Sequence, residues 1–420
     1  MLPNIGRASR LAAALFVAAT ALGAAGSASA EMRLTTLDAA TILGLQPLLE
    51  RGEVVLIEAK KNGRLRQGTV LKIADASAEA VLAVVADMES YPRFIPNVVR
   101  SEIVQSDGVR TDLAWELEIP FVNLSGVNRV VDERPAGIRY RPLEGDIKQA
   151  RFRWEATPLG DGRSVVAHYV AADIGEASWF LEKFIEARPS VEPGAVVSTA
   201  LVLVKAICAE AARRQGKRVP PRPRMGGRHK PKIDSVAREL AAGGVRKSLR
   251  RLLKRGVVGL VRSKRDGRLA QAVMLQDVGR APEAVHAVAR DPRDYPEFIP
   301  SIASVSITQR EGNKLRYLSE IKMPLIDLEV LTELKEMSGL RLAFKIVSGD
   351  LKSGRYAYEF LPMANGNRTL MVFYTNTDIR DQSWFLKKLI EKEPYYQHGL
   401  NLGLGFVNVR AVAKRTMSQP

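Results

Sequence analysis

The chain has 420 residues, and its 63 lysines and arginines outweigh 46 aspartates and glutamates to give a formal net charge of +17. The single cysteine, Cys208, excludes an internal disulfide, so each domain must be large enough to be stabilised by burial alone. The four histidines show no metal-ligand spacing, and no nucleophile elbow or phosphate-binding glycine loop is present, so we expect no metal, no cofactor and no catalytic motif.

The N-terminus has the residue order of a secretory signal. Arg7 and Arg10 precede an apolar run from Leu11 to about Ala25, and small residues come after it at Ala28-Ser29-Ala30. We therefore expect a signal peptide over residues 1–30 and a periplasmic or secreted protein. The alternative is an uncleaved membrane anchor, which a short run rich in Ala and Gly disfavours.

From residue 38 onward the predicted elements come in a regular order. Residues 38–50 read as a short amphipathic helix, residues 53–59 and 65–73 as the strands of a hairpin, and residues 77–88 as a helix. Strand-like runs separated by turn signals then extend from about residue 98 to residue 172. A long helical region over residues 178–215, interrupted near Pro189 and Pro193, completes this part of the chain.

The most informative stretch ends the helix predicted over residues 77–88. It reads Asp87-Met-Glu-Ser-Tyr91-Pro92-Arg-Phe94-Ile95-Pro96, and it returns as Asp291-Pro-Arg-Asp-Tyr295-Pro296-Glu-Phe298-Ile299-Pro300, at an offset of 295 − 91 = 204 residues. The same offset relates Gly145-Asp146 to Gly349-Asp350, and an offset of 205 relates Ser178-Trp179-Phe180-Leu181 to Ser383-Trp384-Phe385-Leu386. A period this long equals a whole domain, so the chain is a tandem duplication in which each copy buries its own core.

The order of elements and the D-x-x-x-Y-P-x-F-I-P motif resemble the START-like helix-grip superfamily (SRPBCC), in particular its polyketide cyclase and coenzyme Q-binding branch. The resemblance covers about residues 53–212 and 257–415, once per copy. It implies an α+β fold with two helix-grip domains, each a curved antiparallel sheet wrapped around a long C-terminal helix. We therefore expect a first domain over residues 31–212, a basic, proline-rich linker over residues 213–234 and a second domain over residues 235–420.

Several aromatic and apolar residues are candidate ligand contacts, because the resemblance implies that the Tyr-Pro segment borders a ligand cavity. Packing alone is the alternative for the Tyr-Pro segment, and a helix N-terminal staple is the alternative for the Trp-Phe pairs. Trp115 alternates with Leu113 and Leu117 on one strand face, which we expect to be the cavity side. The candidates are Tyr91, Phe94, Ile95, Trp115, Trp179, Phe180, Tyr295, Phe298, Ile299, Trp384 and Phe385.

The basic residues suggest a second contact surface. Arg246, Lys247, Arg250, Arg251 and Lys254 alternate with apolar residues in the pattern of a basic amphipathic helix. Such a helix is a candidate for contact with an anionic membrane, and the alternative is a helix packed on its own domain with a solvated basic face. No nucleic-acid-binding motif is present, and we expect no nucleic-acid partner. The sequence predicts no particular oligomeric state.

The leading function hypothesis is periplasmic binding or transport of a hydrophobic molecule, which the resemblance implies to be lipid, sterol-like or quinone-like. The rival is a cyclase, aromatase or hydrolase that acts on a bound apolar substrate and needs polar groups in its cavity. A third hypothesis is that one copy has lost its cavity and serves as a docking surface. At the 204-residue offset Trp115 aligns with Ser319 and Leu113 with Tyr317, so the two interiors should differ in shape.

Overall fold

The computed structural model describes residues 33–119, 122–177, 182, 185–186, 189–220, 223, 231–323, 326–351, 353–363, 366–380 and 384–419. The predicted signal peptide, residues 1–30, lies outside these residues. Contacts group the chain from Arg33 onward into one unit, which contains both copies of the duplication. Copy 1 denotes residues 33–214, and copy 2 denotes residues 231–419.

Copy 1 begins with two short helices, because Pro47 falls in the first turn of the second and interrupts the single helix predicted there. Asp38 and Ser77 cap α2 and α4 by accepting the backbone N–H of Thr41 and Ala80. The elements are α2 (Ala39–Gly44), α3 (Gln46–Leu49), β1 (Glu53–Ala59), β2 (Leu65–Ala74), α4 (Ala78–Ala86), η1 (Met88–Ser90), α5 (Tyr91–Phe94), β3 (Val98–Ser106), β4 (Arg110–Ile119), β5 (Val122–Asp132), β6 (Ile138–Gly145), β7 (Ala150–Pro158), β8 (Ser164–Ala172), η2 (Ile174–Ala177) and α7 (Val191–Arg214).

The long helical region of copy 1 is interrupted by a turn at Pro189, as the sequence predicts, and its main helix is α7. It begins at Val191, so Pro193 lies in its first turn, where a missing N–H leaves no intrahelical bond unmade. Among the described residues α7 is long and apolar enough to cross a membrane by composition, but 67% of its apolar window is buried inside the protein. The helix is therefore accounted for as the core helix of its domain.

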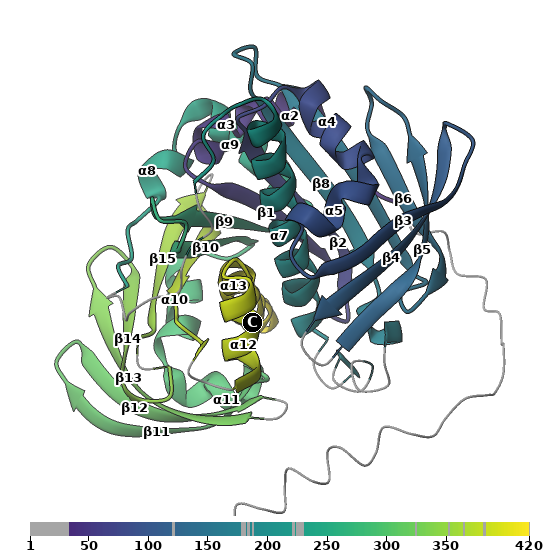
Figure 1. Cartoon of the computed structure of the whole chain (residues 1–420). Coiled ribbons are helices and arrows are strands. Elements are labelled where there is room, and N and C mark those ends of the chain that lie inside the picture. The colour runs from purple at the N-terminus through teal and green to yellow at the C-terminus, as the bar shows by residue number, and fades with distance from the viewer. Residues whose placement is uncertain are drawn as a thin grey trace, which may run out of the picture. The chain divides into compact units, whose positions relative to one another are not determined.

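Copy 2 repeats this order with a longer start. Its elements are α8 (Ala237–Leu240), α9 (Gly243–Leu253), β9 (Val257–Ser263), β10 (Leu269–Val278), α10 (Pro282–Arg290), η3 (Pro292–Asp294), α11 (Tyr295–Phe298), β11 (Ile302–Glu311), β12 (Lys314–Met323), β13 (Ile326–Met337), β14 (Arg341–Gly349), β15 (Arg355–Met363), β16 (Arg368–Asn376), α12 (Trp384–Lys392) and α13 (Tyr396–Ser418). Figure 1 shows a curved sheet and a long C-terminal helix in each copy, which confirms the α+β class with two helix-grip domains.

The two sheets join edge to edge into one antiparallel sheet of 16 strands, in the order β11-β12-β13-β14-β15-β16-β10-β9-β1-β2-β8-β7-β6-β5-β4-β3. The junction is the pairing of β1 with β9, in which Val55 lies opposite Gly259. These two residues are equivalent in the duplication, since 259 − 55 = 204. The copies are therefore related by a local two-fold axis that passes between Val55 and Gly259.

The two long helices cross close to the same axis. Gly194 and Ser198 of α7 meet Gly403 and Gly399 of α13, and a Cβ added to Gly194 would lie 2.8 Å from the Gly403 Cα. Ser198 donates its hydroxyl to the Gly194 carbonyl at 2.6 Å, so it fits the crossing without exposing an unpaired group. Small residues four apart on both helices let the two backbones touch, which fuses the copies into one core.

Apolar clusters lie on both faces of the central strands. On one face, the sheet packs against Val197 and Leu201 of α7 and Phe406 of α13. On the other face, Val54, Leu56, Val258 and Leu260 pack with the short helices at the start of each copy. The apolar side of α9, formed by Val245, Leu249, Leu252 and Leu253, belongs to this second cluster. Both faces of the junction strands are therefore covered.

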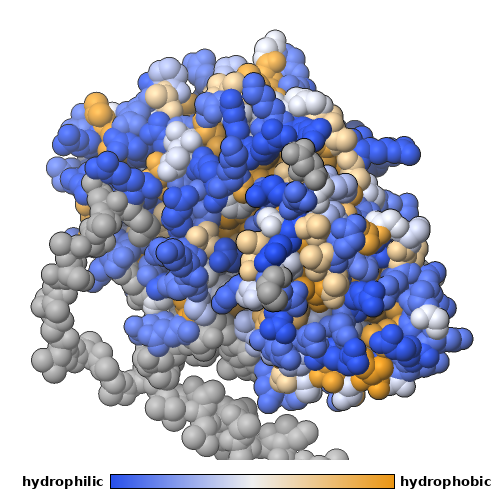
Figure 2. All heavy atoms as spheres, turned by 180° about the vertical axis from the view of Figure 1, so that it is seen from behind, coloured by the Kyte–Doolittle hydropathy of each residue, from blue (hydrophilic) through white to orange (hydrophobic). Residues whose placement is uncertain are grey.

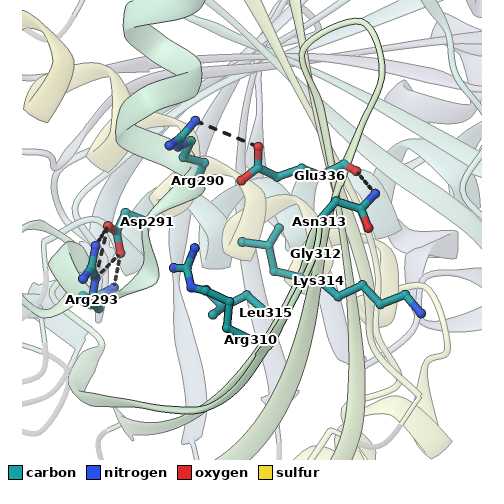
Figure 3. Close-up of a pocket in the computed structure, with 10 residues that line it drawn as sticks. Arg290, Asp291, Arg293, Arg310, Gly312, Asn313, Lys314, Leu315 and Glu336 are labelled. Carbon is teal, nitrogen blue, oxygen red and sulfur yellow. Dashed lines mark hydrogen bonds and ion pairs between the residues drawn. The ribbon is translucent and has the colours of Figure 1, made fainter.

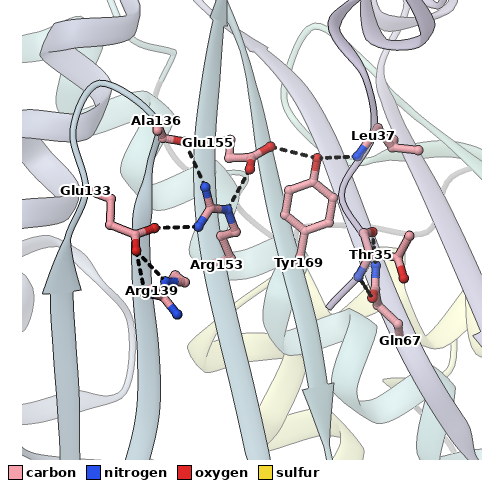
Figure 4. Close-up of polar contacts among 9 residues, drawn as sticks. All are labelled: Thr35, Leu37, Gln67, Glu133, Ala136, Arg139, Arg153, Glu155 and Tyr169. Carbon is pink, nitrogen blue, oxygen red and sulfur yellow. Dashed lines mark hydrogen bonds and ion pairs between the residues drawn. The ribbon is translucent and has the colours of Figure 1, made fainter. Parts of the chain in front are cut away.

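A polar network on copy 1 ties the start of the chain to the sheet (Figure 4). The Gln67 amide accepts the Thr35 N–H at 2.8 Å and donates to the Thr35 carbonyl at 2.8 Å. The Tyr169 hydroxyl accepts the Leu37 N–H at 3.1 Å and donates to Glu155 at 3.1 Å. These bonds fix the chain segment before α2 against β2 and β8.

Copy 2 repeats this network. Gln271 bonds the backbone of Asp234 at 2.8 and 2.9 Å, and the Tyr374 hydroxyl bridges the Val236 N–H and Glu359 at 3.1 and 2.6 Å. The duplication thus extends to individual hydrogen bonds. The structured part of copy 2 begins no later than Asp234, where the predicted linker ends.

We expect Gly399→Ala to destabilise the protein, because its Cβ would lie 2.0 Å from the Ser198 Oγ and 2.4 Å from the Ser198 Cα. The helices must separate to accept it, and overpacking of this kind costs about 1–3 kcal/mol. Urea unfolding measures the change. Gly244→Ala is the matched control, because nothing lies within 4 Å of its added Cβ. Equal stability of the two variants would show that the crossing does not hold the copies together.

Candidate functional site

The Tyr-Pro motif closes the end of the helix that precedes it. The Tyr91 hydroxyl donates to the Val85 carbonyl at 2.6 Å and lies 3.0 Å from the Tyr140 hydroxyl. In copy 2 the Tyr295 hydroxyl donates to the Ala289 carbonyl at 2.5 Å. Burial raises the pKa of both motif tyrosines, so both hydroxyls stay protonated. The contacts are those of the packing alternative, and a ligand contact by these two rings stays a prediction.

The other residues of the motif are packed in the same region. Phe94 and Phe298 each make an edge contact with the motif tyrosine at a centroid distance of 5.8 Å. Ile95 and Ile299 are buried in the main apolar cluster.

The structure does not describe the side chains of the predicted Trp-Phe pairs. Trp179 and Phe180 lie outside the described residues. Trp384 and Phe385 begin α12, a helix separate from the long helix α13 that the sequence expects them to start, and their side chains lie outside the described part. Ligand contact by these four residues stays a prediction.

The sheet of copy 1 presents a continuous inner face to α7. Strand register places Trp115 opposite Ser101, Leu113 opposite Asn128, Trp154 opposite His168 and Tyr140 opposite Phe152. Leu113, Tyr140 and Trp154 share an apolar cluster with Val197 and Leu201 of α7, so this is the face that α7 covers. Leu113 and Trp115 share one face of their strand, as the sequence predicts, and that this face lines a ligand cavity stays a prediction. The inner face consists of Ser101, Leu113, Trp115, Gly126, Asn128, Val130, Ile138, Tyr140, Phe152, Trp154 and His168.

Three inner-face residues of copy 1 carry buried polar atoms that have no hydrogen-bond partner among the described residues: the Ser101 Oγ, the Trp115 Nε1 and the Asn128 Oδ1. A fourth residue, His168, makes no well-aligned hydrogen bond among the described residues, and the Arg153 backbone lies beside its ring. Ser101 is 5% exposed and His168 is 1% exposed. A buried polar group without a partner costs about 1–3 kcal/mol, so such groups are rare unless something else satisfies them.

His168 is held between two aromatic rings of the neighbouring strand. Its ring stacks on Trp154 at a centroid distance of 4.0 Å and lies 6.4 Å from Phe152, nearly parallel to it. Burial lowers the pKa of His168 to about 3, so the imidazole is neutral at physiological pH. A neutral imidazole has one N–H donor and one acceptor nitrogen, and it can bind a hydroxyl or a carbonyl of a ligand.

The equivalent face of copy 2 is filled by interlocking aromatic rings. Tyr317 and Phe373 replace Leu113 and His168, and Tyr358 contacts Phe373 at 4.6 Å and Phe360 at 5.6 Å. Two polar groups on this face are bonded within the protein: Ser319 donates to the Val330 carbonyl at 3.4 Å, and the Tyr356 hydroxyl lies 2.7 Å from the Thr377 Oγ1. The two interiors therefore differ, as the alignment of Trp115 with Ser319 predicts.

A buried charge cluster lies where α7, β1, β2 and α13 meet. The Glu53 carboxylate receives the Lys205 ammonium at 2.5 Å and the Lys72 ammonium at 2.9 Å. Burial opposes the charge of Glu53, but the two ammoniums outweigh it and lower the pKa of Glu53. Lys205 also stands over the Tyr395 ring of copy 2, 4.6 Å from its centroid. Sequence reasoning missed this cluster, although Lys205 interrupts an apolar helix and was a signal that a partner must exist.

Figure 3 shows a small polar hollow on copy 2 between the end of α10 and the turn from β11 to β12. Its volume is about 90 Å³, and its walls carry Arg290, Arg293, Arg310 and Lys314 with Asp291 and Glu336. Asp291 pairs with Arg293, and Glu336 lies 4.0 Å from Arg290. A hollow of this size is too small for a lipid-sized molecule.

The basic helix predicted near residues 235–254 is α9, and its two sides have different surroundings. The apolar side is buried, so it is not available for insertion into a bilayer. Arg246, Lys247, Arg250, Arg251 and Lys254 are all exposed. Arg251 reaches Thr41 at 2.8 Å and Asp38 at 3.3 Å on copy 1. Figure 2 shows one face of the molecule to be mostly hydrophilic, with scattered apolar patches. Membrane contact by these cations stays a prediction.

Among the described residues, no group of three or more His, Cys, Asp and Glu is arranged to hold a metal ion. Cys208 is buried, and desolvation raises the pKa of its thiol to about 12. His398 is also buried, and desolvation together with the nearby Lys205 lowers its pKa to about 3.

The duplicated sheet and long helix define a tandem protein of the START-like helix-grip superfamily. The chain belongs to the family described as polyketide cyclase / dehydrase and lipid transport, whose family model matches residues 74–188 and 278–380, one segment in each copy and just over half of the chain. This family combines the binding of lipids or other hydrophobic ligands with cyclase- or aromatase-type activity on one fold.

Similar solved structures include two-domain and one-domain proteins. The di-domain aromatase/cyclase StfQ from the steffimycin biosynthetic pathway is 15% identical, with 83% of this chain and 97% of that chain covered and a TM-score of 0.29. The di-domain aromatase/cyclase BexL is 12% identical, with 85% and 100% covered and a TM-score of 0.29. A STAR-related lipid transfer protein from Xanthomonas axonopodis is 9% identical, with 39% and 94% covered and a TM-score of 0.29. Comparison with curated proteins gave no match.

We expect His168 to make the stability of the protein depend on pH. Its pKa is about 3 in the folded state against 6.5 for the free group, so the unfolded chain takes up the proton first as the pH falls. Stability is full above pH 6.5 and is lost between pH 6.5 and 3, by about 1.4 kcal/mol per pH unit at the steepest.

His168→Phe, which installs the residue of copy 2, should remove this share of the pH dependence. Urea unfolding of both proteins at pH 7, 6, 5 and 4 measures it. His398 titrates in both proteins and cancels in the comparison. Parallel stability curves would mean that His168 is protonated, or solvated, in the folded protein.

Proposed function

We propose that this protein binds a largely apolar molecule in copy 1, between the inner face of the sheet and α7. The molecule carries a few hydrogen-bonding groups, as a sterol-like, quinone-like or polyketide-like compound does. Apolar burial against Leu113, Trp154 and Val170 supplies the binding free energy, at roughly 25 cal/mol per Å² before the cost of association. Copy 2 stabilises the fold and provides the exposed cations of α9.

One observation carries this proposal: within the described part of the chain, unpartnered polar atoms of the inner face occur in copy 1 and not at the equivalent positions of copy 2. Ser101 and His168 are replaced by Val305 and Phe373 in the other copy. The same fold is therefore stable with apolar residues at these positions. Polar residues that cost stability and are not needed for folding fit a binding face, where a ligand satisfies them.

The pKa of His168 favours binding over catalysis. A general base works best when its pKa lies near the working pH, and a value of about 3 makes the imidazole a weak base. It donates or accepts a hydrogen bond at pH 7 without taking a proton from carbon. Cyclase or aromatase activity is the competing function. Because His168 is a weak base, such an enzyme would need a substrate whose C–H group is already acidic.

The predicted signal peptide and the cations of α9 suggest where the ligand is exchanged. We infer an exported carrier that approaches an anionic membrane through Arg246, Lys247, Arg250 and Lys254. Each such cation near an anionic surface contributes about 1 kcal/mol. Because the apolar side of α9 is buried, this contact is electrostatic and does not insert the helix.

The first test is organic extraction and mass spectrometry of the mature protein, purified without detergent. We expect one apolar molecule per chain. Exchanging the polar residues of copy 1 for those of copy 2, in the double variant Ser101→Val and His168→Phe, should lower the bound amount at least tenfold, since each lost hydrogen bond to a ligand is worth about 1 kcal/mol. Val104→Ser is the control, because Val104 is on the same strand and 65% exposed.

Two results would count against the proposal. A folded protein that yields no apolar molecule, before and after incubation with a lipid extract, would exclude a carrier. Equal loading of the double variant and the Val104→Ser control would move the ligand away from the inner face of copy 1.

The membrane contact is tested by co-sedimentation with vesicles that contain about one third phosphatidylglycerol. Changing Arg246, Lys247, Arg250 and Lys254 to Glu should abolish binding at low salt, because four attractive charges become repulsive. The wild-type chain should lose its binding as salt rises. The matched control changes the exposed Arg218, Lys217, Arg213 and Lys232 of the linker region to Glu. Equal loss in both variants would assign the effect to net charge and not to α9.

A further inference from the structure

A second hollow, of about 400 Å³, opens beside α13 at the end of β10 in copy 2. Its size falls in the range of small-molecule sites. Apolar groups and cations share its walls, which are formed by Gln276, Asp277, Val278, Gly279, Arg368, Arg410, Ala413, Lys414 and Met417. This groove is separate from the inner face of copy 1, so it does not rest on the function proposed above.

Arg410 is the exceptional residue of the groove. Its side chain is half-buried, and it has no ion-pair or hydrogen-bond partner within the part of the chain that the structure describes. Its guanidinium stands over the Phe406 ring, 5.4 Å from the centroid, and burial lowers its pKa. Removing a charge from water without a counter-ion is costly, so a cation in this state calls for an anion.

The duplication shows what Arg410 lacks. Its equivalent in copy 1 is Lys205, at the 205-residue offset, and Lys205 is paired with the Glu53 carboxylate at 2.5 Å. The equivalent of Glu53 in copy 2 is Val257, which is buried in the apolar cluster. Copy 2 has therefore kept the cation and lost its carboxylate, and the 400 Å³ groove lies at the place where copy 1 is closed by the ion pair.

The remaining charges of the groove do not compensate Arg410. Asp277 is engaged by Arg368 at 2.9 Å through its Oδ2. Lys414 adds a further exposed cation. The walls thus carry three cations and one acid. Val278, Ala413 and Met417 supply an apolar wall next to this positive charge.

We propose that this groove of copy 2 binds an anionic amphiphile, whose carboxylate or phosphate head pairs with Arg410 and whose apolar chain lies along Val278, Ala413 and Met417. The ligand head takes the place that the Glu53 carboxylate has in copy 1. An arginine suits this role because its planar guanidinium binds two oxygens of one carboxylate or phosphate at once.

The test compares dodecanoate with dodecanol, which share a chain and differ in the charge of the head. Titration calorimetry is done on the mature His168→Phe chain, so that the inner face of copy 1 is already altered. We expect dodecanoate to bind at least tenfold more tightly than dodecanol, since a charge-assisted hydrogen bond to the head is lost with the alcohol. Arg410→Met should abolish this difference, and Arg410→Lys should restore most of it.

Val257→Glu is the sharper variant, because it returns the carboxylate of copy 1 to copy 2. The new carboxylate pairs with Arg410, so preference for dodecanoate should disappear while the protein folds. Lys314→Met, which removes an exposed cation in the other hollow, is the matched control and should leave the preference unchanged. The proposal is overturned if the wild-type groove shows no preference for dodecanoate and Arg410→Met also leaves vesicle binding unchanged, or if Arg410→Met and Val257→Glu both keep the preference for dodecanoate.

A vesicle arm distinguishes the two sources of such a head group. Phosphatidylglycerol vesicles are co-sedimented with the wild-type chain and with Arg410→Met at the same salt. Loss of vesicle binding in Arg410→Met, without dodecanoate binding to the wild type, assigns the groove to a membrane lipid. Dodecanoate binding with unchanged vesicle binding assigns it to a free amphiphile. If the folded protein neither binds dodecanoate nor loses vesicle binding in Arg410→Met, the proposed site is wrong.

Discussion

The antiparallel pairing of β1 with β9 is the contact on which the rest of the structure depends. Because Val55 lies opposite Gly259, its own equivalent, every other contact between the copies derives from one local two-fold axis. The axis brings the long helices together at Gly194, Ser198, Gly399 and Gly403, where only small side chains let two backbones touch. The two domains each contribute a sheet and thus share one core, and β1 and β9 pair with each other instead of being exposed edge strands.

A shared core changes what a duplication can do. In copy 1, Lys205 lies under Tyr395 of copy 2, and Asn97 reaches the Tyr396 hydroxyl at 3.4 Å. The start of α13 therefore helps to close copy 1. The copies are no longer independent binding modules, and each residue on the axis side has a different neighbour from its equivalent. This frees one copy to keep a binding face while the other is filled with aromatic rings.

The same comparison between copies identifies both candidate sites. The inner face of copy 1 keeps polar atoms where copy 2 has Val305 and Phe373. The groove of copy 2 keeps a cation where copy 1 has the complete pair of Glu53 and Lys205. In each case one copy shows the same position without an unpaired polar group, either because apolar residues replace it or because an ion pair completes it. Unsatisfied polar groups in the other copy then mark the places where a ligand is expected.

The sequence by itself determined the duplication, the order of helices and strands, and the α+β class, because these depend on local patterns that repeat in register. It also predicted the side of the strand on which Leu113 and Trp115 lie, since strand residues alternate. It could not decide the start of α7, where Pro193 fits the first turn instead of breaking a longer helix. Only the tertiary structure decided that the two sheets fuse, that the apolar side of α9 is covered, and that Lys205 has a carboxylate partner while Arg410 has none among the described residues. These outcomes depend on contacts between residues more than one hundred positions apart, and no local pattern in the chain records such distances.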